Sequence, residues 1–115
     1  MIKKAAQVVD EIKVNMRGGD GEVIIKTVFE KGEYKSKARL IATISLEKGC
    51  SIGEHIHENE EEIFIIQQGT ATYNDNGEVK TLKKGDACLC LYKQKHSIRN
   101  DYDETLIFTA VIITY

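Results

Sequence analysis

Three histidines and one glutamate are the residues of this chain whose types and spacing could do chemistry. His55 and His57 stand two positions apart, and Glu62 follows five residues after His57. The third and last histidine, His96, lies in a later segment that also begins with glycine. Side chains at i and i+2 of an extended chain point the same way, so the first two imidazoles share a face. Imidazole with carboxylate suits a divalent transition metal, and the pattern predicts a metal site.

The elements that must position these residues are predicted to be β-strands. Residues 23–29 and 39–46 are rich in β-branched side chains, and the second segment alternates apolar with polar residues. Asn76-Gly77 is a strong hairpin signal. About nine short strands with turn signals every 8–12 residues predict an all-β antiparallel sandwich or barrel. The other expected strands are a short one carrying the two nearby histidines, then 62–68, 70–73, 78–82, 87–92, 96–100 and 105–114.

The N-terminal region permits more than one interpretation. Residues 1–16 carry a weak helical period, compatible with a short helix or with a strand followed by a turn. Residues 18–21 contain three glycines in four positions, which favours a turn. Successive backbone N–H groups there could form an anion-binding nest beside Arg17. A flexible connection into the first long strand is the favoured interpretation.

Length and composition narrow the class of protein. A chain of 115 residues is long enough to bury one core, and a formal net charge of -2 without a basic stripe argues against nucleic acid or anionic membrane as a partner. No apolar run approaches the roughly 20 residues that span a bilayer, and no signal-peptide core is present. Three cysteines fit a reducing compartment, so a cytoplasmic location is expected. Cys88 and Cys90 are expected to be buried structural thiols.

The first glycine-led segment, residues 49–69, carries a family pattern. It reads Gly49, five residues, His55-Ile56-His57, four residues, Glu62, six residues, Gly69. In this segment the chain resembles the cupins, small double-stranded β-helix or jelly-roll proteins, at every position of their first motif.

The second segment, residues 85–100, follows the second cupin motif with two departures. It reads Gly85, five residues, Leu91-Tyr92-Lys93, two residues, His96, three residues, Asn100. Leu91 replaces the proline of the family pattern and Lys93 replaces its middle glycine, which puts the geometry of the turn before His96 in doubt.

The resemblance implies one cupin domain over residues 1–115, with about nine to eleven strands and a divalent metal ion (Mn, Fe, Ni, Zn or Co) inside the barrel. The acidic neighbours Glu58, Glu60 and Glu61 are expected to form a solvated loop, with Glu61 as the fallback ligand. The interior is expected to be lined by Phe64, Ile66 and Ile98, with Leu89 and Leu91 as further candidates. The implied metal ligands are His55, His57, Glu62 and His96.

The favoured function is a metalloenzyme acting on a small oxygenated organic molecule, as dioxygenase, decarboxylase or isomerase. The alternative is a non-catalytic sensor or binding module that uses the same pocket. A metal-free epimerase or structural barrel is a third interpretation, which the complete ligand set disfavours. A homodimer is expected, with the apolar strand 106–113 as an edge that association would cover. The candidates for a proton-handling group are Glu54, Gln68, Tyr73, Tyr92 and Lys95.

Overall fold

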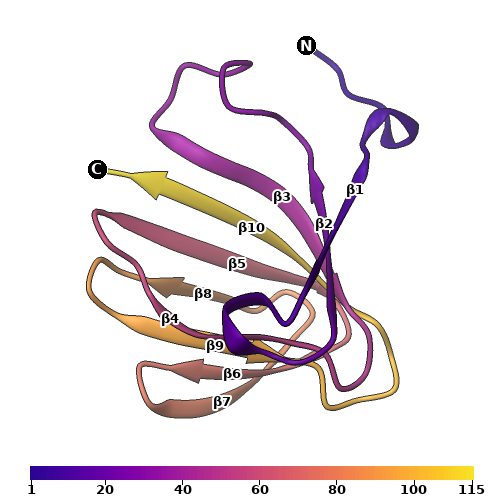
Figure 1. The fold of residues 1–115 in the computed structure, drawn as a ribbon, viewed down its shortest axis with the longest axis vertical. Helices are drawn as coiled ribbons and strands as arrows, with labels where there is room; N and C mark the ends of the chain where they lie inside the picture. Colours follow the sequence, from indigo (N-terminus) through magenta and orange to yellow (C-terminus); the bar gives the residue numbers. More distant parts are fainter.

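The computed structural model describes residues 1–115 and contains ten β-strands in two antiparallel sheets (Figure 1). The six-stranded sheet has the order β1-β2-β3-β10-β5-β8, and the four-stranded sheet has the order β4-β9-β6-β7. The all-β, double-stranded β-helix prediction is confirmed. The strands are β1 (Asp10–Val14), β2 (Glu22–Thr27), β3 (Ala38–Leu46), β4 (Ser51–Ile56), β5 (Glu60–Gln68), β6 (Thr70–Asp75), β7 (Glu78–Lys83), β8 (Ala87–Cys90), β9 (Lys95–Arg99) and β10 (Leu106–Thr114).

The core lies between the two sheets and follows from the two-residue period of the strands. In β10, Leu106, Phe108, Ala110 and Ile112 are buried, whereas the residues between them are half-buried. The same parity in β5 places Glu62 on the inward face. A carboxylate at an apolar core position is costly unless a partner compensates it.

Strand β10 is central in its sheet. It pairs with β3 along one side and with β5 along the other, and Figure 1 shows it between them. The edges of this sheet are β1 and β8. The expectation that residues 106–113 form an edge is therefore wrong, because the apolar run reflects a strand paired on both sides. A homodimer stays a prediction, and β10 cannot supply its edge.

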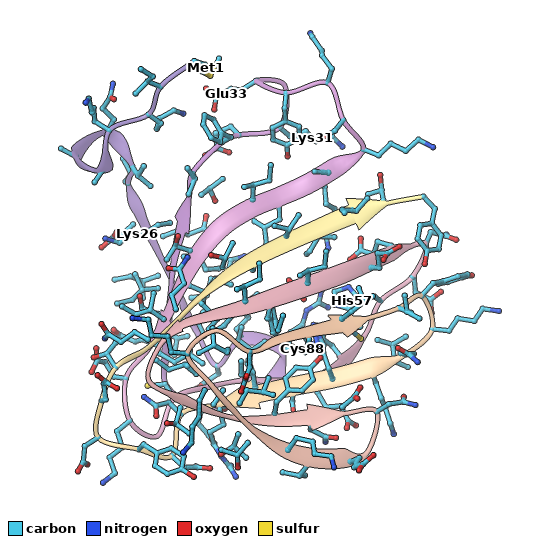
Figure 2. All side chains as sticks on the ribbon, turned by 180° about the vertical axis from the view of Figure 1, so that it is seen from behind. Met1, Lys26, Lys31, Glu33, His57 and Cys88 are labelled. Atoms are coloured by element: carbon cyan, nitrogen blue, oxygen red, sulfur yellow. The ribbon has the colours of Figure 1, made fainter.

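Strand β8 presents its cysteines inward, whereas Leu89 within it and Leu91 just after it point outward. Leu89 is 45% exposed and Leu91 is 41% exposed, whereas Cys90 is 1% exposed. Cys88 packs against the core, and Figure 2 shows it in the interior. The expected lining by Leu89 and Leu91 is wrong. Burial raises the pKa of both thiols, Cys88 and Cys90, to about 11.

The N-terminal region consists of a 3-10 turn, η1 (Ala5–Gln7), then β1, then a second 3-10 turn, η2 (Met16–Gly18). No helix in the chain has the length and apolarity that a membrane crossing requires. The turn η2, drawn as a dark coil in Figure 1, lies against β4. The Asp20 N–H donates to Ser51 Oγ at 2.9 Å, and the Ser51 N–H donates to the Asp20 carbonyl at 2.8 Å. The segment 15–21 is thus packed on β4, unlike the flexible connection that the sequence favoured.

Candidate metal centre

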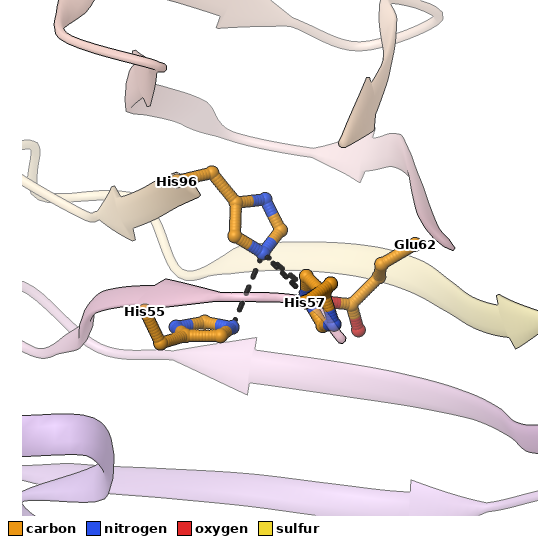
Figure 3. A group of neighbouring side chains, drawn as sticks. All are labelled: His55, His57, Glu62 and His96. Atoms are coloured by element: carbon orange, nitrogen blue, oxygen red, sulfur yellow. Dashed lines mark hydrogen bonds and ion pairs between the residues drawn. The ribbon is translucent and has the colours of Figure 1, made fainter. Parts of the chain in front are cut away.

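Three strands bring together all four residues that the sequence singled out (Figure 3). His55 lies on β4 and His57 directly after it, Glu62 is on β5, and His96 is on β9 opposite His55. One ligand atom from each lies within 4.8 Å of the others. His57, Glu62 and His96 are buried, and His55 is half-buried. The donor group therefore sits inside the barrel, where Figure 2 also shows His57.

The ring atoms that converge are the Nε2 nitrogens. His96 Nε2 lies 3.0 Å from His57 Nε2 and 3.2 Å from His55 Nε2. Glu62 Oε1 lies 3.0 Å from His57 Nε2 and 3.2 Å from His96 Nε2. Three imidazole nitrogens and one carboxylate oxygen thus face a common centre.

The Nδ1 nitrogens of the same rings point to other oxygen atoms. His55 Nδ1 lies 2.7 Å from the Gly53 carbonyl oxygen, and His57 Nδ1 lies 2.7 Å from Glu60 Oε2. His96 Nδ1 lies 2.8 Å from the Tyr73 hydroxyl oxygen. A neutral imidazole that donates its Nδ1–H outward presents its Nε2 lone pair inward, which is the usual arrangement of a metal-bound histidine.

These residues fit a divalent metal ion. An octahedral ion with bonds of about 2.1 Å places neighbouring ligand atoms about 3.0 Å apart. A tetrahedral zinc ion with similar bonds separates its ligands by about 3.4 Å. Four of the separations between ligand atoms are 3.0–3.2 Å, close to the octahedral value, and all of the atoms lie within 4.8 Å of one another. Without added positive charge, several electron-pair donors would face one another in a buried space.

The pKa directions agree with this need for positive charge. Burial acts to raise the pKa of the Glu62 carboxyl, but hydrogen bonds with His57 and His96 outweigh it, and the net pKa is lowered. Burial acts to lower the pKa of His57, but Glu62 and Glu60 outweigh it, and the net pKa is raised. For His55 burial prevails, and its pKa is lowered. The cluster thus keeps a carboxylate ionised beside imidazoles that accept a proton or a metal ion.

Glu60 contacts the donor group, which its place in the sequence did not indicate. It was expected in a solvated loop, but it begins β5, and its carboxylate contacts both His57 and Arg39. Arg39 Nε and Nη2 donate to the two Glu60 oxygens at 2.6 and 2.7 Å, and this guanidinium lowers the pKa of Glu60 to about 2. Arg39 lies on β3, which β10 separates from β5. No local spacing could have shown this pair, because it depends on the order of strands in the sheet.

Glu58 and Glu61 stay outside the donor group, so the choice of Glu62 over its neighbours agrees with the geometry. Among the proton-handling candidates, only Tyr73 contacts the cluster, at the Nδ1 side of His96. The others are engaged elsewhere. Glu54 contacts Asn74 and Lys95, Gln68 donates to the Thr105 carbonyl, and Tyr92 packs against Tyr115.

A cavity of about 460 Å³ opens at the donor group. Its polar wall includes His55, His57 and Glu62 of the cluster. Its apolar wall comes from residues on several strands, among them Val14, Ile25, Leu40, Ile44, Ile52 and Ile112. Three cationic residues line it as well: Lys13, Arg17 and Arg39. A metal-bound small anion would meet both apolar surface and positive charge there.

The family and its relatives agree with this geometry. Residues 42–112 match the model of the cupin domain family, and the chain belongs to the cupins. Over 113 residues it is 40% identical to a protein of Thermotoga maritima named oxalate-binding protein, covering 98% of this chain and 93% of the relative.

Solved structures share the fold. A Thermotoga maritima protein described as a predicted oxalate decarboxylase superimposes with a TM-score of 0.96 at 39% identity, with 100% of both chains covered. A putative sugar phosphate isomerase from Acidithiobacillus ferrooxidans superimposes with a TM-score of 0.81 at 21% identity, covering 99% of this chain and 75% of that one. The second likeness shows the fold alone.

Proposed function

We propose that this cupin binds a small dicarboxylate of the oxalate class through a divalent metal ion. The observation that carries the proposal is the convergence of three Nε2 atoms and one carboxylate oxygen on a cavity whose wall also carries cationic residues. The likeness to Thermotoga maritima proteins described as an oxalate-binding protein and a predicted oxalate decarboxylase supports it. The residues that would hold the ion are His55, His57, Glu62 and His96.

Different residues would contribute to binding in different ways. A bound divalent ion would supply positive charge and coordination positions for carboxylate oxygens. Gly53, Glu60 and Tyr73 hold the three imidazoles so that their Nε2 atoms point at the common centre. The apolar residues of the cavity wall lower the local polarity, which strengthens the attraction between the anion and the positive charges.

The cavity favours binding over the turnover that the sequence motifs suggested. Conversion of oxalate to formate and carbon dioxide delivers one proton to carbon, which calls for an acid on the cavity side of the donor group. Besides the donor residues, the ionisable side chains lining the cavity are Glu11, Lys13, Arg17 and Arg39. Glu11 and Lys13 are exposed on β1, and two arginines are poor proton donors at neutral pH.

Calorimetric titration of oxalate into manganese-loaded and metal-free protein tests the proposal. We expect 1:1 binding to the loaded protein and no binding to the metal-free protein. Absence of binding to the loaded protein by oxalate and by malonate would remove the proposed function. In the same samples, formate is measured to detect turnover, and steady formate production would instead support the decarboxylase interpretation.

A further inference from the structure

We propose that Arg17 is the residue that receives the outer carboxylate oxygens of the bound dianion, the end that faces away from the donor group. This role rests on the proposed function and names the second contact of the same ligand. It also gives a purpose to the Arg17-Gly18-Gly19 turn, which the metal site itself does not use.

Arg17 differs from the two other cations that line the cavity. Arg39 is engaged by both oxygens of Glu60, and Lys13 Nζ lies 3.7 Å from Glu11 Oε1. Arg17 has neither an ion pair nor a side-chain hydrogen bond anywhere in the chain. Arg17 is exposed, as Lys13 is, and it is one of the residues that line the cavity. An unpaired guanidinium there offers a planar set of N–H donors that matches a carboxylate.

The backbone of Arg17 is fixed relative to the donor group. A Cβ added to Gly53 would overlap the Arg17 carbonyl oxygen and stand 2.8 Å from the Gly19 nitrogen. A Cβ added to Gly19 would meet the backbone of Ser51 and Gly53. The turn η2 and strand β4 therefore touch backbone to backbone, with no side chain between them.

The same short stretch of β4 also orients a donor. Gly53 lies against Arg17 on one side, and its carbonyl oxygen accepts the hydrogen bond from His55 Nδ1. The backbone of Arg17 and the imidazole of His55 are thus set from one backbone position. The Arg17 side chain therefore starts from a fixed point beside the donor group, which reduces the freedom that it loses when it binds a ligand.

The backbone conformation of Arg17 supplies a clean test variant. Arg17 has φ 56° and ψ 30°, in the left-handed region that asparagine and glycine adopt more easily than arginine. Arg17→Asn removes the guanidinium while keeping a residue that favours this conformation. The control is Arg99→Asn, which removes an exposed guanidinium that pairs with Asp101.

The experiment measures metal content, oxalate affinity and acetate affinity of manganese-loaded wild type, Arg17→Asn and Arg99→Asn. We expect unchanged manganese content in both variants. Oxalate affinity should fall about 10- to 100-fold in Arg17→Asn and stay unchanged in Arg99→Asn, because hydrogen bonds to charged groups are the strong ones. Acetate, which has no second carboxylate, should lose little affinity.

The outcomes separate this role from the proposed function. Oxalate binding by Arg17→Asn as tight as that of wild type would overturn the role of Arg17 and leave the proposed function standing. Loss of manganese from Arg17→Asn would overturn it too, since Arg17 would then act through the fold of the metal site. Absence of oxalate binding by the wild type would overturn the proposed function together with the role that rests on it.

Discussion

The two glycine-led segments, residues 49–69 and 85–100, contribute unequally to the donor group. The first supplies three of the four donor residues and matches the cupin pattern throughout, whereas the second supplies His96 alone and departs from the pattern twice. The departures leave the turn intact. Lys93 stands where the pattern has glycine and adopts φ 71°, and its N–H donates to the His57 carbonyl at 2.8 Å.

This difference shows that the second motif requires a left-handed backbone conformation at this position, which glycine adopts easily and which Lys93 adopts here. Lysine can occupy a left-handed position at a cost of about 1–2 kcal/mol, and the hydrogen bond to His57 helps to hold it there. The place of His96 is set by strand register, because β9 pairs with β4 and puts His96 opposite His55. Substitutions in the turn before His96 are therefore tolerated, whereas substitutions of the donor residues should abolish metal binding.

The largest expected effect comes from removing one donor from either segment. His57→Ala and His96→Ala should each lower metal affinity by more than about 100-fold, since removing a ligand costs more than removing its hydrogen-bond partner. Metal content after dialysis, measured by mass spectrometry, checks this. Glu58→Ala is the control, because Glu58 is exposed and outside the donor group. Retained metal in His96→Ala would mean that the first segment suffices.

Substitution of Glu60 should have an intermediate effect on metal affinity. This residue belongs to the first segment and contacts one of its three donors, His57. Glu60→Gln keeps the size of the side chain but removes the charge that His57 Nδ1 and Arg39 contact. Metal affinity should fall by about 10- to 100-fold, as for other hydrogen-bond partners of metal-bound histidines. Competition with a fluorescent chelator measures it, with Glu58→Gln alongside. Equal affinities of the two variants would restore the solvated-loop interpretation.

The smallest expected effect concerns the turn of the second segment. Lys93→Gly should raise the free energy of unfolding by about 0.5–1 kcal/mol, because relief of the left-handed conformation outweighs the backbone entropy of glycine. Urea unfolding of metal-free protein measures this change. The reverse substitution in the first segment, Gly49→Ala, should lower the same free energy by about 1 kcal/mol, since φ is 84° there.

Two observations separate backbone strain from side-chain contacts in these turn variants. No atom lies within 4 Å of a Cβ added to Gly49, so its cost reports backbone strain without a steric clash. If Lys93→Gly were less stable than wild type, the lysine side chain would stabilise the fold by more than its left-handed backbone costs. Lys93 Nζ lies 5.2 Å from the centre of the Tyr92 ring.

The sequence predicted those features that depend on local spacing. The two-residue period of a strand put His55 and His57 on one side, the motif spacing from His57 to Gly69 singled out Glu62, and the turn residues indicated the all-β class. What it missed depends on pairing between distant segments. An apolar run such as 106–114 has the same composition at a sheet edge and at its centre. In β8, cysteine alternates with leucine, both apolar, so parity did not reveal the buried face.

The central position of β10 has a consequence for how the donor group forms. All four donors precede β10 in the chain, yet Glu62 lies on a strand that needs β10 as its neighbour. The six-stranded sheet is complete only when β10 has paired, so Glu62 takes its final place after the last strand of the chain has joined. The metal centre depends on contacts between residues far apart in the sequence. Such contacts form slowly during folding and are lost together when the domain unfolds.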